Sequence, residues 1–342
     1  MKRLKSGLII SVMMLILLVT WACSNNSPKE EQPADDASPL TESYDVVVAQ
    51  DGSGDFTTVM DAVRAAPLRS ETPVRIFIKK GVYKEKVLIA TIKPNIHLIG
   101  EDRDETVITY DDYAGMTKPT GGKMSNEEIP TVYITGNDFY AENLTFENSA
   151  GTIAQALAMY VKGDRAVFYN VRFLGWQDTL RVEGYRSYFK DCYIEGHVDY
   201  IYGSGTAVFE NCTIHSKDKG YITASSAPQE SKFGMVFLNC RITGSAPEGS
   251  VYLGRPWRDY AAVAFISCEM DAVIRPEGWH NWGSEAKEKT ARYAEYGNRG
   301  PGADTSKRVA WAKQLTDEEA AQYTIENILG GSDGWDPRAR IQ

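Results

Sequence analysis

A degenerate repeat in the middle of the chain constrains the fold more than any other feature of the sequence. Six segments share one pattern, in which aromatic or aliphatic residues precede a polar turn residue and a short alternating strand. The turn residues are separated by 27, 21, 20, 28 and 28 residues, and they are Asn143, Asn170, Asp191, Asn211, Asn239 and Ser267. Short strands at this spacing, with no helical pattern between them, indicate a solenoid of stacked coils rather than propeller blades. The sequence therefore predicts an all-β, parallel β-helix.

Stacked coils place equivalent residues of neighbouring coils ~4.8 Å apart. We therefore expect the polar turn residues to form an internal ladder that satisfies backbone groups at a bend. The cysteines that follow four of them should line an adjacent inward row; they are Cys192, Cys212, Cys240 and Cys268. Reduced thiols that pack as small apolar residues are the expected state. Two disulfides are the alternative, since an exported protein with an even number of cysteines often forms them.

The segments on either side of the repeat extend the solenoid in both directions. The amphipathic stretch 58–66 predicts a short helix that caps the open end, and residues 317–328 predict another short helix at the far end. Strands of the first coils are expected over residues 75–78, 97–99 and 107–108. A single domain over residues 43–342, with short capping helices, accounts for this part of the chain.

The N-terminus resembles a bacterial lipoprotein signal. Basic residues precede an apolar run over residues 8–19, which is short for a membrane span and fits a secretory signal. The run leads to Cys23, the expected lipidated residue. We predict a signal peptide over residues 1–22 and a flexible polar tether over residues 23–42, hence an exported outer-membrane or cell-surface lipoprotein of a bacterium. Secretion with cleavage nearby is the alternative.

The charge of the chain disfavours one class of partner. The formal net charge is −9, and loss of the three basic residues of the signal takes it to −12. An acidic chain without a basic tract is not typical of a nucleic-acid-binding protein. It does not exclude a polyanionic substrate, because the charge of a cleft can differ from the total.

Two aspartates recur at the period of the repeat. Asp178 lies eight residues after Asn170, and Asp199 lies eight residues after Asp191. Their carboxyl groups are therefore expected one above the other on an outward face, at roughly the inter-strand spacing of ~5 Å. Two carboxylates that close do not both ionise easily, so one becomes an acid and the other a base or nucleophile. His197 is a weaker candidate for the base.

Amide, cationic and aromatic residues complete the candidate site. Gln155 and Gln177 offer amide donors to a developing oxyanion. Arg255 is a natural partner for one carboxylate, and Trp257 and Tyr202 offer flat faces to a sugar ring. The sequence contains no nucleophile elbow and no metal-ligand spacing, so we expect neither metal nor organic cofactor. These residues favour a two-carboxylate carbohydrate enzyme, and purely structural roles for the turn residues are the alternative.

Ordered motifs span nearly the whole mature chain, over residues 48–56, 81–85, 155–158, 175–180, 196–203, 252–257, 276–282 and 300–303. In this order they resemble the pectin methylesterases, a carbohydrate esterase family of plants and microbes. The resemblance implies a right-handed parallel β-helix. It also implies hydrolysis of the methyl esters of polygalacturonate, which releases methanol and leaves demethylated polygalacturonate.

The resemblance implies a role for each candidate in the chemical steps. Asp199 would be the nucleophile that forms an acyl-enzyme, and Asp178 would protonate the departing methanol and then accept a proton from water. Gln177, assisted by Gln155, would stabilise the oxyanion.

The remaining candidates would hold the substrate and the nucleophile. Arg255 would keep Asp199 ionised. The residues expected to contact galacturonate are Trp257, Tyr202, Gln155 and Arg255. The tyrosines at positions 200 and 202 replace the phenylalanines usual in the family, so their hydroxyls are expected to affect subsite preference. Residues 111–128 match poorly, and the threonine that normally contacts substrate there cannot be assigned.

Two other functions fit part of the sequence. A polygalacturonase or pectate lyase uses the same scaffold, although an acidic calcium cluster expected for a lyase is not evident in the sequence. A non-catalytic glycan-binding solenoid is the other alternative. The methyl-esterified polymer is the expected partner, the only expected membrane contact is the lipid at Cys23, and the protein is expected to be a monomer.

Overall fold

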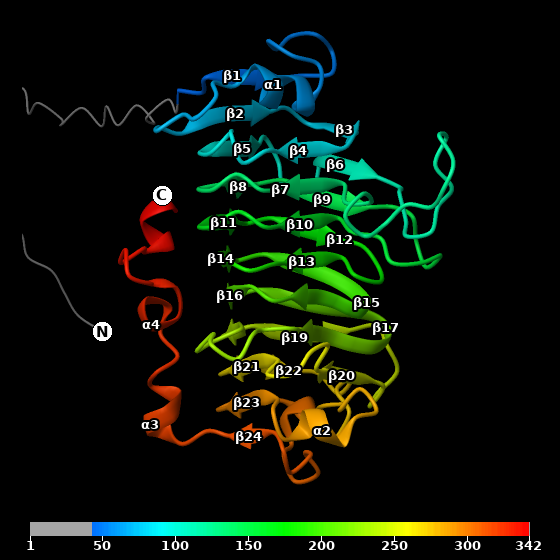
Figure 1. The fold of residues 1–342 in the computed structure, drawn as a ribbon, viewed down its shortest axis with the longest axis vertical. Coiled ribbons are helices and arrows are strands. Elements are labelled where there is room, and N and C mark those ends of the chain that lie inside the picture. The colour runs from blue at the N-terminus through cyan, green and yellow to red at the C-terminus, as the bar shows by residue number, and fades with distance from the viewer. Residues whose placement is uncertain (1–42, 342) are drawn as a thin grey trace, which may run out of the picture. The chain divides into compact units, whose positions relative to one another are not determined.

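The computed structural model describes residues 43–341, and these residues form a parallel β-helix (Figure 1). Within this part of the chain every pairing between strands is parallel. The strands form one sheet of 11 and one sheet of 13. The parallel β-helix predicted from the repeat is confirmed. The expected signal peptide, the tether and Cys23 lie outside the described residues.

The 11-stranded sheet contains the first strand of each coil. Its strands are, in spatial order, β1 (Val46–Val48), β2 (Val74–Ile78), β5 (Ile96–Gly100), β8 (Tyr140–Glu142), β11 (Ala166–Tyr169), β14 (Arg186–Lys190), β16 (Thr206–Glu210), β18 (Met235–Leu238), β21 (Ala262–Ile266), β23 (Arg292–Tyr296) and β24 (Lys313–Gln314). Val167 pairs with Tyr188, which pairs with Val208. These pairs are 21 and 20 residues apart, which are the spacings between the corresponding turn residues. The alignment of the coils predicted from the repeat is therefore confirmed.

The 13-stranded sheet consists of two rows of strands that β15 (Tyr193–Gly203) and β17 (Thr213–Ser225) join, because each of these long strands pairs in both rows. The first row also contains β3 (Gly81–Lys84), β6 (Thr106–Tyr110), β9 (Thr145–Asn148), β12 (Arg172–Leu174), β19 (Arg241–Gly244) and β22 (Glu269–Met270). The second row also contains β4 (Val87–Ile89), β7 (Val132–Ile134), β10 (Met159–Val161), β13 (Leu180–Val182) and β20 (Val251–Gly254). The expected strands at 75–78, 97–99 and 107–108 are β2, β5 and part of β6.

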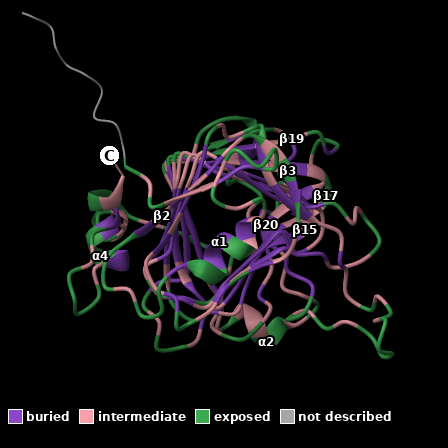
Figure 2. Ribbon diagram, turned by 90° about the horizontal axis from the view of Figure 1, so that it is seen from above, coloured by how far each residue is buried: buried purple, intermediate pink, exposed green. Residues whose placement is uncertain are grey.

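Stacked side chains fill the interior of the coils, which Figure 2 shows as buried. Five phenylalanines from consecutive coils stack with their ring centroids 4.7, 4.6, 4.6 and 4.4 Å apart, and they are Phe168, Phe189, Phe209, Phe237 and Phe265. Offset stacking adds to the free energy gained by burying each ring. Because each coil repeats the same interior residue type, the stack holds neighbouring coils in one register.

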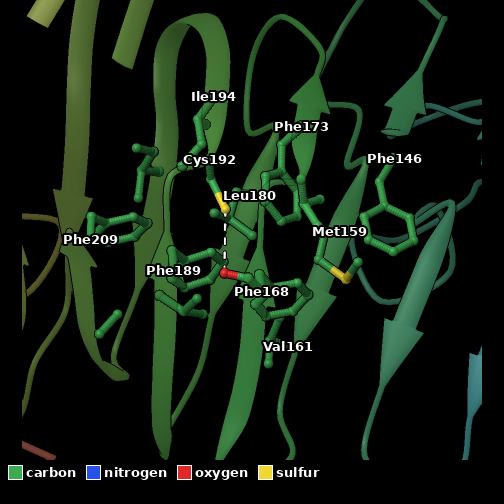
Figure 3. Packing of buried hydrophobic residues seen from close by; sticks show 14 of the residues in the cluster. Phe146, Met159, Val161, Phe168, Phe173, Leu180, Phe189, Cys192, Ile194 and Phe209 are labelled. Atoms are coloured by element: carbon green, nitrogen blue, oxygen red, sulfur yellow. Dashed lines mark hydrogen bonds between the residues drawn. The ribbon is translucent and has the colours of Figure 1, made fainter. Parts of the chain in front are cut away.

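The four cysteines lie beside this stack as buried free thiols. Each Sγ contacts the carbonyl oxygen of a phenylalanine in the preceding coil, and the Cys192 contact with Phe168 is 3.5 Å long (Figure 3). The predicted inward row of reduced thiols is confirmed, and the alternative of two disulfides is wrong.

The polar turn residues do not form an internal ladder, so this prediction is wrong. All six have φ between +50° and +56° and are partly or fully exposed at the surface. One side-chain hydrogen bond links two of them, from Asn170 Nδ2 to Asn143 Oδ1 at 2.6 Å. Asn and Asp recur here because their short polar side chains tolerate the left-handed conformation that the corner requires.

The predicted N-terminal cap is confirmed as helix α1 (Val59–Ala65), which covers one end of the interior (Figure 2). Thr58 caps its N-terminus by accepting a hydrogen bond from Asp61 N. Glu85 accepts further bonds from the backbone N–H groups of Val59 and Met60, each at 2.8 Å. The motif at residues 81–85 therefore has a structural role.

The C-terminal segment differs from the prediction of one helix over residues 317–328. It forms two short helices, α3 (Asp317–Ala320) and α4 (Ile325–Leu329), because Thr324 caps a new start by accepting a bond from Asn327 N. They run along the outside of the 11-stranded sheet (Figure 1), where apolar residues of α4 pack with Tyr188 and Val208. The remaining helices are α2 (Glu285–Glu288) and the 3-10 helices η1 (Pro301–Ala303) and η2 (Pro337–Arg340). None of the helices formed by residues 43–341 is long and apolar enough to span a membrane.

Candidate active site

Asp178 and Asp199 lie at equivalent corners of adjacent coils. In the strands that follow them, Leu180 pairs with Ile201, which is the same offset of 21 residues. The backbone N–H of Asp178 donates to Val198 O at 3.1 Å. The backbone positions of the two aspartates are therefore aligned from one coil to the next, as the spacing predicts. Their exposed fractions are 7% and 6%, so both carboxyl groups are largely withdrawn from water.

The backbone at this corner is irregular in both coils. Asp178 and Asp199 have φ of +66° and +51°, in the left-handed region. The register of β15 shifts between Gly196 and Ile201, as in a β-bulge, and bulges often redirect a side chain beside an active site. Thr179 Oγ1 donates to Glu195 O at 2.9 Å and ties the two coils together.

Arg255 holds one of the two aspartates. Its Nε donates to Asp199 Oδ1 at 2.9 Å and its Nη2 donates to Asp199 Oδ2 at 2.7 Å. The guanidinium carbon lies 3.9 Å from the ring centroid of Tyr221 and 3.7 Å from that of Trp282. The two rings restrict the guanidinium to one orientation. The role of Trp282 was missed in the sequence, although it ends one of the ordered motifs.

Small residues let Arg255 reach a carboxylate two coils away. Arg255 follows β20, and Gly254 pairs there with Thr223 of the intervening coil. A Cβ at position 254 would lie 2.0 Å from Thr223 Oγ1, so only glycine fits. The next residue of that coil is Ala224, which pairs with Tyr202 of β15 and whose side chain is a single methyl group.

The surroundings of the two carboxyl groups favour different charge states. Burial, followed by the charge of Asp199, raises the pKa of Asp178 to about 8. Burial also raises the pKa of Asp199, but hydrogen bonds and charge from Arg255 oppose this shift. Asp178 therefore keeps its proton near neutral pH, and Asp199 is the partner whose ionised form is stabilised.

Gln155 and Gln177 lie on neighbouring loops beside the pair. The Gln177 carbonyl accepts from Ala156 N at 3.1 Å, which connects the two loops directly. Both side chains are partly exposed, and within residues 43–341 neither side-chain amide forms a hydrogen bond. The amides therefore remain available to a bound molecule.

Trp257 is partly exposed next to the aspartates, and Tyr202 lies buried beside it, with 4% of its surface exposed. Their rings meet edge to face with centroids 5.8 Å apart, in a cluster that includes Tyr160. The Tyr202 hydroxyl lies near enough to favour the ionised form of Asp178, but the contact lacks hydrogen-bond geometry. An aromatic surface beside a carboxyl pair is suited to a sugar ring.

Tyr200 does not belong to this surface, contrary to expectation. Its ring is fully buried in the core, and its hydroxyl lies 2.9 Å from Ser216 Oγ. Alternation along a regular strand would place Tyr200 and Tyr202 on the same face, and the irregularity of β15 between Val198 and Ile201 separates them.

Two other expectations concern the edges of the site. Residues 111–128 reach it, since Ala114 and Met124 pack against the aromatic cluster. His197 forms no side-chain hydrogen bond to the described residues, and burial lowers its pKa. A neutral imidazole without a bond to either carboxyl group is a poor candidate for the base.

Comparison with known proteins gives one consistent result. The Pectinesterase family model matches residues 45–332. Pectinesterase 31 of Arabidopsis thaliana is 44% identical over 294 residues, which cover 83% of this chain and 92% of that protein.

Solved structures agree with the sequence match. Pectin methylesterase from carrot superimposes with a TM-score of 0.81 at 34% identity, covering 88% of this chain and 98% of that one. A pectin methylesterase in complex with a hexasaccharide gives a TM-score of 0.76 at 35% identity, covering 86% and 98%. These neighbours are right-handed parallel β-helices, which confirms the handedness expected for this chain.

Proposed function

Because this chain belongs to the pectinesterase family and catalyses the demethylesterification of pectin, we propose that Asp199 and Asp178 perform the hydrolysis as nucleophile and general acid–base. The enzyme is a carboxylic ester hydrolase that acts on methyl-esterified polygalacturonate. The observation that carries the assignment of roles is the arginine pairing, since Arg255 binds Asp199 alone.

In the first half of the reaction, an Oδ of ionised Asp199 attacks the carbonyl carbon of the galacturonate methyl ester. Negative charge develops on the carbonyl oxygen, where the amide of Gln177, assisted by Gln155, donates hydrogen bonds. Asp178 gives its proton to the methoxy oxygen as the C–O bond breaks. Methanol leaves, and an acyl-enzyme anhydride joins Asp199 to galacturonate.

In the second half, Asp178 is ionised and takes a proton from a water molecule. The resulting hydroxide attacks the galacturonate carbonyl of the anhydride, and the bond to Asp199 breaks. Galacturonic acid and the Asp199 carboxylate are released, with Asp178 again protonated. The raised pKa of Asp178 suits a group that must both donate and accept a proton near neutral pH.

Arg255, Trp257 and Tyr202 hold the reacting groups in place. Arg255 keeps Asp199 ionised and fixes its orientation, and both it and Gln155 border the bound ester. Trp257 stacks against a galacturonate ring, and the largely buried Tyr202 packs edge to face against Trp257. Aromatic faces of this kind bury the apolar side of a sugar.

Trapping the intermediate tests the proposal. Hydroxylamine added during turnover should divert the anhydride to a galacturonate hydroxamate, which mass spectrometry detects. An Asp199→Ala variant and an enzyme-free sample control for direct attack on the ester. Hydroxamate at the same level in all three samples would contradict an acyl-enzyme. Methanol without new reducing ends or unsaturated ends separates the esterase from a polygalacturonase or a lyase, and a non-catalytic solenoid would release none.

The placement of the enzyme outside the cytoplasm follows from its polymeric substrate. We propose that residues 1–22 are a signal peptide, that Cys23 carries a lipid, and that residues 23–42 tether a monomeric domain to a bacterial surface. Basic residues, an apolar run and a cysteine in this order support the lipoprotein signal. Labelling with a radioactive fatty acid, lost in a Cys23→Ala variant, tests the anchor.

A further inference from the structure

A second arginine lies in the same outward-facing column as the aromatic surface of the site. Arg181 of β13 pairs in register with Tyr160 on one side and with Tyr202 on the other. Its guanidinium carbon is 4.4 Å from the Tyr160 ring centroid, 5.6 Å from that of Tyr202 and 5.9 Å from that of Trp257. The proposed mechanism gives this cation no role, although it is only three residues beyond Asp178.

Most of the hydrogen-bonding capacity of Arg181 is unused. Its Nε donates to Glu183 Oε2 at 2.6 Å. Among the described residues neither Nη1 nor Nη2 donates a hydrogen bond, and neither is a buried polar atom without a partner, so both reach solvent. The residue as a whole is 8% exposed. A guanidinium held by three rings and one carboxylate thus presents its two terminal amino groups to the groove.

The carboxylate of Glu127 lies opposite one of these amino groups without a close contact to it. Glu127 Oε1 lies 3.5 Å from Arg181 Nη1, which is too long for a good hydrogen bond. The Glu127 side chain is 59% exposed and belongs to the segment 111–128 at the edge of the site. Because Glu127 is exposed and its contact with Arg181 is long, the pair stabilises little, and another carboxylate can displace Glu127.

The two arginines near the dyad therefore differ in what they can bind. Arg255 uses its Nε and one terminal amino group on Asp199. Arg181 has two adjacent donors free, and this planar fork matches the two oxygens of a carboxylate. The polymer supplies such a group wherever a galacturonate unit has already lost its methyl ester, and a methyl ester carries no charge there.

We propose that Arg181 binds the free carboxylate of a galacturonate unit neighbouring the ester under attack and displaces Glu127 as it does so. The inference rests on the proposed function and adds a preference within the substrate class. Esters beside demethylated units are then hydrolysed faster than esters surrounded by other esters. Because each turnover creates a new carboxylate, the preference favours contiguous demethylation.

The test compares two defined oligogalacturonates of equal length, one fully methyl-esterified and one with a single free acid beside an ester. The measured quantity is the ratio of kcat/KM on the second substrate to that on the first. Arg181→Met, which keeps an unbranched apolar stem against the rings, should lower this ratio roughly tenfold or more. Arg181→Lys should retain part of the wild-type ratio, because lysine keeps the positive charge but lacks the planar pair of donors of a guanidinium.

Glu127→Gln provides a change in the opposite direction. It removes a competing carboxylate from an exposed position, so the ratio should rise a few-fold. Arg241→Met, at an exposed arginine of the first row of strands, is the matched control and should leave the ratio as in the wild type.

The outcomes separate this inference from the proposed function. If wild-type protein releases no methanol from either substrate, the proposed function fails. If methanol is released but Arg181→Met lowers kcat/KM equally on both substrates, Arg181 is a structural residue and the inference is wrong. An unchanged ratio in Glu127→Gln would likewise contradict displacement of Glu127.

Discussion

Arg255 binds Asp199 through two parallel hydrogen bonds, of 2.9 Å to Oδ1 and 2.7 Å to Oδ2. Asp178, one coil away, has no arginine bound to it among residues 43–341, and burial raises its pKa to about 8. Two chemically identical side chains on neighbouring coils thus have surroundings that favour different protonation states. The proposed division into nucleophile and acid follows from this difference.

Replacing Arg255 should change the acid side of the pH profile. In Arg255→Met, burial of Asp199 is no longer opposed, so the pKa of Asp199 rises further and the acid limb of kcat/KM moves to higher pH. We expect kcat to fall by on the order of a hundredfold. Arg255→Lys, which keeps the charge but loses the fork, should be intermediate. An acid limb that stays in place in Arg255→Met would contradict this role.

The alkaline side of the same profile should report Asp178. The proposed first step needs a protonated Asp178, so kcat/KM should decline as pH rises through about 8. Steady-state methanol release across pH measures this decline. The residual activity of Asp178→Asn should not show this alkaline decline in kcat/KM, because the amide does not titrate. The same alkaline decline in Asp178→Asn would assign it to another group.

Asp178 should also make the folded state less stable at alkaline pH. Its pKa is 3.8 in an unperturbed carboxyl and about 8 in the folded protein. Between these values the folded state binds a proton that the unfolded chain releases, so its contribution to the free energy of unfolding falls as pH rises. Asp178→Asn does not titrate and therefore does not lose stability in this way. The free energy of unfolding of Asp178→Asn in urea, minus that of the wild type, should increase from about pH 5 to about pH 8. If this difference in the free energy of unfolding does not change with pH, the pKa of Asp178 is not raised in the folded protein.

Gln177 should contribute to catalysis and little to binding of the ground state. Its amide forms no hydrogen bond within residues 43–341 and is assigned to the oxyanion. Removing one such donor typically lowers kcat by about 10²–10³-fold. We expect Gln177→Ala to lose kcat in this range with KM nearly unchanged, and Gln155→Ala to lose less. Equal increases in KM would place both residues in substrate binding alone.

The buried thiols should be unreactive in the folded protein. Cys192, Cys212, Cys240 and Cys268 are free and buried beside stacked phenylalanines. A thiol reagent added to protein beginning at residue 24 should label them only after unfolding by denaturant. Reducing agent should not change the thermal unfolding midpoint. If the denatured protein has fewer reactive thiols without reducing agent than with it, some of the cysteines form disulfides.

Much of the site follows from the sequence because a solenoid repeats one spatial relationship. The spacing of Asn170 and Asp191 sets the offset between two coils, and Asp178 and Asp199 share that offset. Local spacing therefore predicts a contact between residues distant in sequence. The same argument predicts the inward cysteines, which follow the turn residues directly.

Other features escaped prediction because they depend on departures from regularity. The bulge in β15 leaves Tyr200 in the core and Tyr202 in the aromatic cluster, although alternation along a regular strand would place them on one face. The left-handed φ of the turn residues explains their chemistry better than an internal ladder does. Arg181 reaches the site through packing across coils, for which the sequence has no local signal. Trp282 ends an ordered motif, but the motif does not indicate its contact with Arg255.

The most direct test of the account is methanol release from methylated pectin by Asp178→Ala and Asp199→Ala, with Asp191→Ala as the matched control. Asp191 is also a left-handed turn aspartate, but it lies at the opposite end of the first-row strand and outside the site. The account predicts that both site variants lose roughly a thousandfold or more of kcat while folding normally, and that Asp191→Ala retains wild-type turnover. Substantial methanol release by folded Asp199→Ala would contradict it.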